Sequence, residues 1–141
     1  MESANKTTIT VETTVKAPVE KVWQYFTAPE HITKWNNASD DWHTPSAKND
    51  LRVGGDFVYR MEAKDGSFGF DFGGVFDEVK ANKRLAYTIG DGRKVEVDFT
   101  PDGNETKVVE TFEAENMHSH EMQKGGWQAI LDSFKKHVEN N

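Results

Sequence analysis

The fold is decided by the stretch Leu85–Phe99, which reads LAYTIGDGRKVEVDF. Apolar side chains alternate with polar or small ones on both sides of the turn at 90–92. Alternation with a period of two is typical of a strand with one buried face, and a short Gly-Asp-Gly turn joins two such strands. The stretch therefore predicts an antiparallel hairpin that faces the core. Its inward side chains are Leu85, Tyr87, Ile89, Val95, Val97 and Phe99.

The same alternation recurs on both sides of this hairpin, with Gly-rich or polar turns between the runs. In the last run the facing of the side chains stays open, because two apolar residues, Val108 and Val109, are adjacent. We therefore expect an antiparallel sheet built from consecutive hairpins. The further strands are expected at 7–16, 51–61, 68–76 and 106–114.

Helical patterns flank the strands. Pro18 favours the first position of a helix whose apolar residues fall on one stripe up to Phe26, and a second short helix is expected from Pro29 to Trp35. A long helix is expected over about 120–138, where Gly125-Gly126 predicts a close backbone approach or space left for another molecule. The polar segment 36–50 is interpreted as a long loop, which is often functional.

These elements predict an α+β fold, with a curved antiparallel sheet of about six to seven strands around the C-terminal helix and two short helices after the first strand. Seven strands about 4.8 Å apart make a sheet roughly 30 Å wide. A helix is about 10–12 Å across and covers roughly a third of that width. We therefore expect an apolar cavity between the helix and the sheet. One domain over 7–141 is expected, after a disordered segment 1–6.

Composition excludes several classes of function. The 141 residues carry a net charge of -7 and no cysteine, which removes disulfides and thiolate chemistry. An acidic chain without a basic run argues against nucleic acid as a partner and against anionic membranes. Without an apolar leader or an apolar run of about 18 residues, no membrane span is expected and the chain is interpreted as a soluble cytoplasmic protein.

Three catalytic or metal-binding arrangements can be tested against the sequence. His118 and His120 lack a third ligand at a fixed spacing, so no metal site is expected, and Ser119 is interpreted as a helix N-cap. No nucleophile elbow occurs. A buried carboxylate could act as a general base, with Asp71, Glu78, Arg60, Tyr59, Tyr87 and His31 near the cavity. We favour the alternative that Asp71, Glu78 and Arg60 are solvated or ion-paired on the sheet.

Five segments carry a resemblance to a known family: Val15–Trp23, Pro29–Trp35, Leu51–Phe57, Gly74–Val79 and Gly126–Leu131. Extending over about residues 8 to 138, they resemble the START-like (SRPBCC) superfamily and, within it, the family of activators of heat-shock-protein ATPase homologues. The resemblance implies a helix-grip fold with a pocket. It covers the C-terminal domain of the co-chaperone that names the family, and not the separate N-terminal domain that makes much of the chaperone contact.

The resemblance leaves three functions open. The first is binding of a small hydrophobic, aromatic or lipid-like ligand between the sheet and the C-terminal helix, without a cofactor. The second is stimulation of a heat-shock chaperone's ATPase in the stress response, and the third is a cyclase or dehydratase acting on an aromatic substrate. Trp35 and Trp42 are expected at the mouth, either as a lid or as anchors of the loop. The expected ligand-binding residues are Trp35, Trp42, Phe57, Tyr59, Met61, Phe70, Phe72, Tyr87, Met122 and Trp127.

Overall fold

Seven antiparallel strands pair in the order β1-β7-β6-β5-β4-β3-β2, so every strand from β2 to β7 lies beside its neighbour in sequence and β1 joins at the β7 edge. The computed structural model describes residues 7–141, and the expected disorder of 1–6 lies outside this range. The elements are β1 (Thr8–Val15), α1 (Val19–Thr27), α2 (Pro29–Trp35), β2 (Trp42–Asn49), β3 (Asp56–Ala63), β4 (Gly69–Lys80), β5 (Arg84–Ile89), β6 (Lys94–Asp102), β7 (Glu105–Glu113) and α3 (His120–Glu139).

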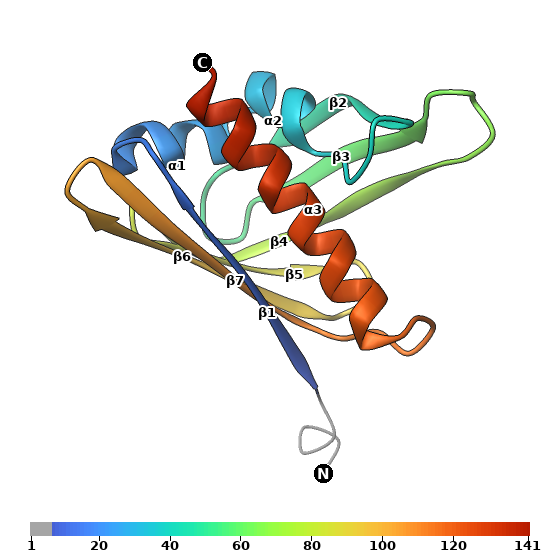
Figure 1. Ribbon diagram of the computed structural model, residues 1–141. Helices are drawn as coiled ribbons and strands as arrows, with labels where there is room; N and C mark the ends of the chain where they lie inside the picture. Colours follow the sequence, from blue (N-terminus) through green and yellow to red (C-terminus); the bar gives the residue numbers. More distant parts are fainter. Residues whose placement is uncertain (1–6) are drawn as a thin grey trace, which may run out of the picture.

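The helix α3 crosses the concave face of the curved sheet, while α1 and α2 cover one end of it (Figure 1). Its residues Leu131, Phe134 and Val138 are at most 1% exposed, and they anchor the helix in the core. The central hairpin β5–β6 presents to this core the six side chains that the alternation predicts. The predicted α+β helix-grip fold is therefore confirmed, with two short helices between β1 and β2.

The edge strand β1 is covered by side chains of α3. Gln128 donates its Nε2 hydrogen to the carbonyl of Glu12, at 3.1 Å, and Lys135 Nζ donates to the carbonyl of Thr14, at 2.8 Å. Glu139 Oε2 accepts the backbone hydrogen of Lys16, at 2.8 Å. An uncovered edge strand is a template for aggregation, and these contacts satisfy that edge.

The helices α2 and α3 begin where the sequence predicts, whereas α1 begins one residue later than expected. Ser119 caps α3, as predicted, because its hydroxyl accepts the backbone hydrogen of Met122 at 3.1 Å. Pro18 is the N-cap of α1 instead of its first residue, with an extended backbone at ψ 155°. A proline fits either position because the amide hydrogen that it lacks has no partner at the start of a helix.

The loop predicted for residues 36–50 is wrong, because β2 occupies most of it. β2 is the edge strand beside β3, and its register shifts between His43 and Ser46, around Pro45. A proline is tolerated at such an irregularity on an edge strand, where one side of the ladder has no partner strand. The polar composition that indicated a loop is thus the composition of an exposed edge.

The glycine pairs Gly73-Gly74 in β4 and Gly125-Gly126 in α3 play different roles. A Cβ on Gly74 would lie 2.2 Å from the carbonyl oxygen of Thr88, so β4 and β5 approach closely at that position. A Cβ on Gly125 or Gly126 would meet nothing within 4 Å, so no backbone approaches α3 there. Gly73-Gly74 lies in regular pairing with β3, and the register shift in β4 falls further on, between Phe76 and Glu78.

These contacts predict opposite effects for the same substitution at two glycines. Gly125→Ala should raise the free energy of unfolding by about 0.5–1 kcal/mol, because it lowers the entropy of the unfolded chain and enters open space. Gly74→Ala should lower it, because the methyl group overlaps the Thr88 carbonyl. Urea unfolding of the two variants beside the wild type checks both signs, and a destabilised Gly125→Ala would contradict the helix geometry.

Candidate ligand-binding cavity

A cavity of about 290 Å³ lies between the concave face of the sheet and the helices. All three helices and five of the seven strands, β2, β3, β4, β5 and β7, contribute to its wall. Its lining residues are Phe26, Thr27, Trp35, Asn36, Asn49, Tyr59, Met61, Phe70, Phe72, Phe76, Leu85, Tyr87, Arg93, Glu110, Trp127 and Ile130. The cavity is therefore mostly aromatic and aliphatic, with a small number of polar groups.

The cavity has a closed end and an open end. At the closed end, the ring of Phe134 contacts those of Phe26 and Trp35 edge-on, with centroids 5.1 and 5.0 Å apart. At the other end, Phe70 is 38% exposed, whereas the remaining lining residues are half-buried or buried. A ligand would therefore enter beside Phe70 and reach toward the short helices.

Seven of the ten residues expected to bind a ligand line this cavity: Trp35, Tyr59, Met61, Phe70, Phe72, Tyr87 and Trp127. The other three do not. Phe57 is 2% exposed and packs within the core, with its ring 5.0 Å from that of Tyr87. Met122 is 65% exposed on the first turn of α3, because the inward position there belongs to the neighbouring Gln123. Trp42 stands at the start of β2, outside the lining.

The two tryptophans expected at the mouth are anchors. Trp35 is 5% exposed at the closed end, and its indole nitrogen donates to the carbonyl of Tyr25 at 2.8 Å. Trp42 begins β2, and its ring packs against those of Phe68 and Phe70 at 6.0 and 6.1 Å. It thereby supports the rim through Phe70 without lining the cavity.

Trp127 closes the helical side of the cavity. Its ring stacks on Phe112 of β7, with centroids 4.0 Å apart and an interplanar angle of 11°, and meets Phe72 of β4 edge-on at 6.4 Å. These two strands lie on opposite sides of the β5–β6 hairpin. A single side chain of α3 therefore spans the cavity between them.

Glu110 is a lining residue that the sequence did not identify. It is 7% exposed and stands on the inward face of β7 between the buried Val108 and Phe112. Within residues 7–141 its carboxyl group makes no hydrogen bond or ion pair. Burial raises the pKa of Glu110 to about 8, because removal from bulk solvent disfavours the charged form.

Three more polar groups face the apolar cavity. The hydroxyls of Tyr59 and Tyr87 make no hydrogen bond within the described residues, and burial raises the pKa of both phenols. The charge of Glu110 raises the pKa of Tyr87 further. The side-chain amide of Asn49 donates to the carbonyl of Thr27 at 2.6 Å, but its Oδ1 atom is buried without a partner. Unsatisfied polar groups of this kind are costly unless another molecule meets them.

The comparisons with known proteins bear on the whole domain. Residues 16–139 match the family model described as "Activator of Hsp90 ATPase homolog 1-like protein". The chain belongs to this family. A search of curated proteins finds no match.

Solved structures of similar sequence agree with this family. The AHSA1-like protein of Aeromonas hydrophila is 46% identical, with a TM-score of 0.90 over 95% of this chain and 93% of that one. The protein Chr148 of Cytophaga hutchinsonii is 57% identical, with a TM-score of 0.81 over 94% and 92%. CV1439 of Chromobacterium violaceum, at 23% identity and a TM-score of 0.82 over 95% and 98%, shares the fold.

The other titratable groups that the sequence offered as candidates for acid–base catalysis lie outside the cavity. Arg60 pairs with Asp71 at 3.4 Å and with Glu62 at 2.9 Å, and Arg84 pairs with Glu78 at 2.9 Å. These ion pairs stand on the outer face of the sheet, as we favoured. His31 also lies away from the cavity, with its Nδ1 atom 3.0 Å from Nε2 of His137.

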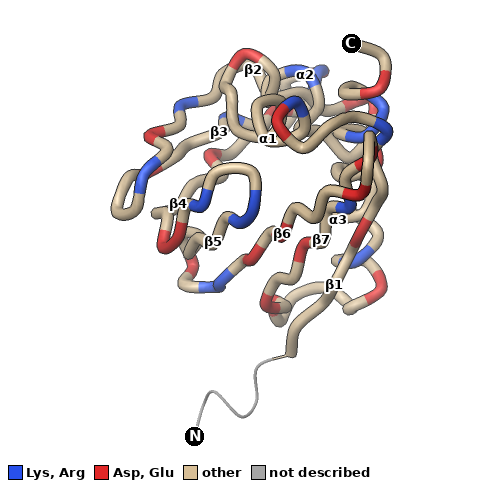
Figure 2. Tube along the Cα trace, turned by 90° about the vertical axis from the view of Figure 1, so that its left-hand side faces the viewer, with Lys and Arg blue, Asp and Glu red and all other residues tan. Residues whose placement is uncertain are grey.

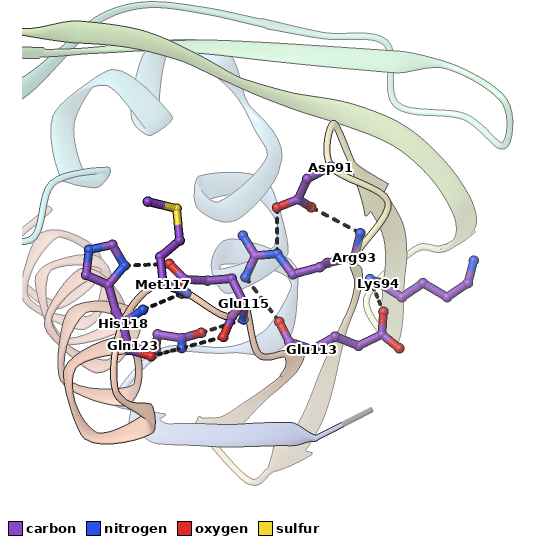
Figure 3. Close-up of polar contacts among 8 residues, drawn as sticks. All are labelled: Asp91, Arg93, Lys94, Glu113, Glu115, Met117, His118 and Gln123. Atoms are coloured by element: carbon purple, nitrogen blue, oxygen red, sulfur yellow. Dashed lines mark hydrogen bonds and ion pairs between the residues drawn. The ribbon is translucent and has the colours of Figure 1, made fainter. Parts of the chain in front are cut away.

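The segment between β7 and α3 is held by its own polar contacts, which Figure 3 shows. The carboxylate of Glu115 accepts the ring hydrogen of His118 at 2.6 Å and the backbone hydrogens of Met117 and His118, which lowers its pKa to about 2. Gln123 bonds to the backbone of Glu115 and of His118. Within residues 7–141, no group of three or more His, Asp or Glu could hold a metal ion.

Charge is spread over the surface, and acidic and basic residues are interspersed along the trace in Figure 2. No continuous basic stripe is visible in that view, which agrees with the net charge of -7. Within residues 7–141, no helix has the length and the apolar character needed to span a membrane.

The position of Glu110 predicts a pH-dependent stability. Between about pH 5 and pH 8 the native state holds a proton that the unfolded chain, whose glutamates titrate near ~4.3, has released. The stability of the wild type should therefore fall as the pH rises through this range, by at most about 1.4 kcal/mol per unit. Glu110→Gln, which does not titrate, should lack this contribution.

Urea unfolding of both proteins at several pH values measures the effect. The stability of Glu110→Gln minus that of the wild type should increase from pH 5 to pH 8 and then level off. Glu12→Gln is the control, because Glu12 lies on the outer face of the neighbouring strand β1 and is exposed. If the free energies of unfolding of the wild type and Glu110→Gln change in parallel with pH, the carboxyl group of Glu110 is solvated.

Proposed function

We propose that this protein binds a small hydrophobic, planar molecule in the cavity between α3 and the sheet, and that it does so in the cytoplasm. The observation that carries the proposal is a cavity with an aromatic wall and four polar groups that have no hydrogen-bond partner among residues 7–141. They are the carboxyl of Glu110, the hydroxyls of Tyr59 and Tyr87, and Oδ1 of Asn49. An ordinary core fills its space with side chains and pairs its polar atoms.

The size and the lining of the cavity support this function. Its volume of about 290 Å³ is at the lower end of the range for small-molecule sites, which are concave, mostly apolar and supplied with a few polar groups. Aromatic rings favour stacked or edge-on contact with a flat molecule. Membership of the family is compatible with small-molecule binding.

The neutral probe 2-naphthylmethanol tests the proposal. It should bind the wild type in a calorimetric titration and move the indole signal of Trp127 in an NMR spectrum. Ile130→Phe, which adds bulk to the cavity wall, should weaken binding by about tenfold or more.

Lys124→Phe is the matched control, because Lys124 is exposed on the same helix and does not line the cavity. It should bind the probe as the wild type does. Equal binding by Ile130→Phe and the wild type would place the probe elsewhere, and no binding by any of them would refute the proposal.

A second candidate is stimulation of a heat-shock chaperone's ATPase as part of the stress response, which the description of the matching family favours. It would act through the surface instead of the cavity. A coupled ATPase assay with the cognate chaperone tests it, and a rate that stays basal at saturating protein would refute it. A cyclase or dehydratase role would need Glu110 as its base, since Asp71 is ion-paired on the outer face. Turnover lost in Glu110→Gln would favour that role over simple binding.

A further inference from the structure

The cavity contains one carboxyl group that the protein itself does not neutralise. Glu110 is 7% exposed and lines the cavity, and within residues 7–141 no hydrogen bond or ion pair reaches its side chain. A buried charge without a partner is expensive, and proteins pair such groups with a cation or a set of donors. Glu110 has neither.

The cation that lines the same cavity is already engaged. Arg93 donates from Nε to the carboxylate of Asp91 at 2.8 Å and from Nη1 to the backbone carbonyl of Glu113 at 3.1 Å (Figure 3). Burial is the cause that raises the pKa of Glu110, and within residues 7–141 no ion pair joins its carboxyl to Arg93. The missing positive charge must therefore come from outside residues 7–141 if Glu110 is to ionise.

The surroundings of Glu110 suit a cation. Its carboxyl shares the cavity with rings whose faces attract positive charge, and a desolvated cation gains most from such contacts. A net charge of -7 also raises the local concentration of cations over that of anions. The rings that line the cavity are those of Phe26, Trp35, Tyr59, Phe70, Phe72, Phe76, Tyr87 and Trp127.

A neutral or acidic ligand would use this site less well. The carbonyl oxygen of a neutral ligand needs only a neutral hydrogen-bond donor. The hydroxyls of Tyr59 and Tyr87, which make no hydrogen bond within residues 7–141, already supply two such donors. A carboxylate ligand would gain no ion pair from Glu110, which is either neutral or negatively charged. The carboxyl of Glu110 is the one group in the lining that can supply negative charge, so it selects for a positive one.

We propose that the ligand is a protonated amine on a flat apolar body, and that its ammonium group pairs with the carboxylate of Glu110 inside the cavity. This inference rests on the proposed function, since it specifies the chemistry of the same site. Pairing moves the proton of Glu110 to the solvent, while the ammonium group keeps its own proton and donates to the two carboxylate oxygens.

Two probes of the same shape test it: 2-naphthylmethylamine, which is a cation at pH 7, and neutral 2-naphthylmethanol. The wild type should bind the amine about tenfold more tightly or better. Glu110→Gln should lose that preference, because a glutamine side chain supplies no negative charge. Glu12→Gln, on the outer face of β1, should behave as the wild type.

Two measurements on the wild type need no variant. The preference for the amine should grow from pH 6 to pH 8, because Glu110 ionises over this range with a pKa raised to about 8. At pH 7 the heat of amine binding should differ between phosphate and Tris buffers, since a proton is released, whereas the heat of alcohol binding should not.

Each result has a definite meaning. If the alcohol binds in the cavity and the amine binds no better, or the preference survives in Glu110→Gln, the amine proposal is wrong and the proposed function stands. If neither probe binds the wild type, both are wrong. Tight binding of the anion 2-naphthoate would likewise overturn the role of Glu110.

Discussion

One helix cannot cover a seven-stranded sheet, and the rest of this structure depends on that mismatch of widths. The sheet curls around α3, and α1 and α2 fill one end, where Phe26, Trp35 and Phe134 pack together. The other end is spanned by Trp127, which reaches from α3 to Phe112 and Phe72. What remains uncovered is a cavity of about 290 Å³.

The cavity explains how β7 can carry the carboxyl group of Glu110, whose burial costs free energy. In a fully packed core, a carboxyl group between Val108 and Phe112 would be buried against apolar neighbours and would strongly destabilise the fold. Here it borders a cavity, where it stays protonated when the cavity is empty and has room for a partner when it is filled. The same holds for the hydroxyls of Tyr59 and Tyr87, so the polar groups and the cavity form one site.

The sequence predicted the elements with strict periodicity, and it failed where two signals competed. The alternation within the expected strands and the apolar stripes of the expected helices were enough for the fold and for seven of the lining residues. β2 was missed because an edge strand with a proline resembles a loop. Glu110 was missed because Val108 and Val109 leave the facing of β7 ambiguous, and pairing with β1 and β6 decides it. Polar Thr106 and Glu110 on the buried face gave no apolar signal to follow.

The central claim is that Glu110 is buried at a cavity without a partner among residues 7–141, and its own titration tests that claim most directly. The side-chain carboxyl carbon of Glu110, assigned by comparison with Glu110→Gln, can be followed by ¹³C NMR from pH 3 to pH 10. The account predicts a pKa of about 8 for the empty protein. An ordinary value near ~4.3 would mean that water or a protein donor reaches the carboxylate, and it would contradict the account.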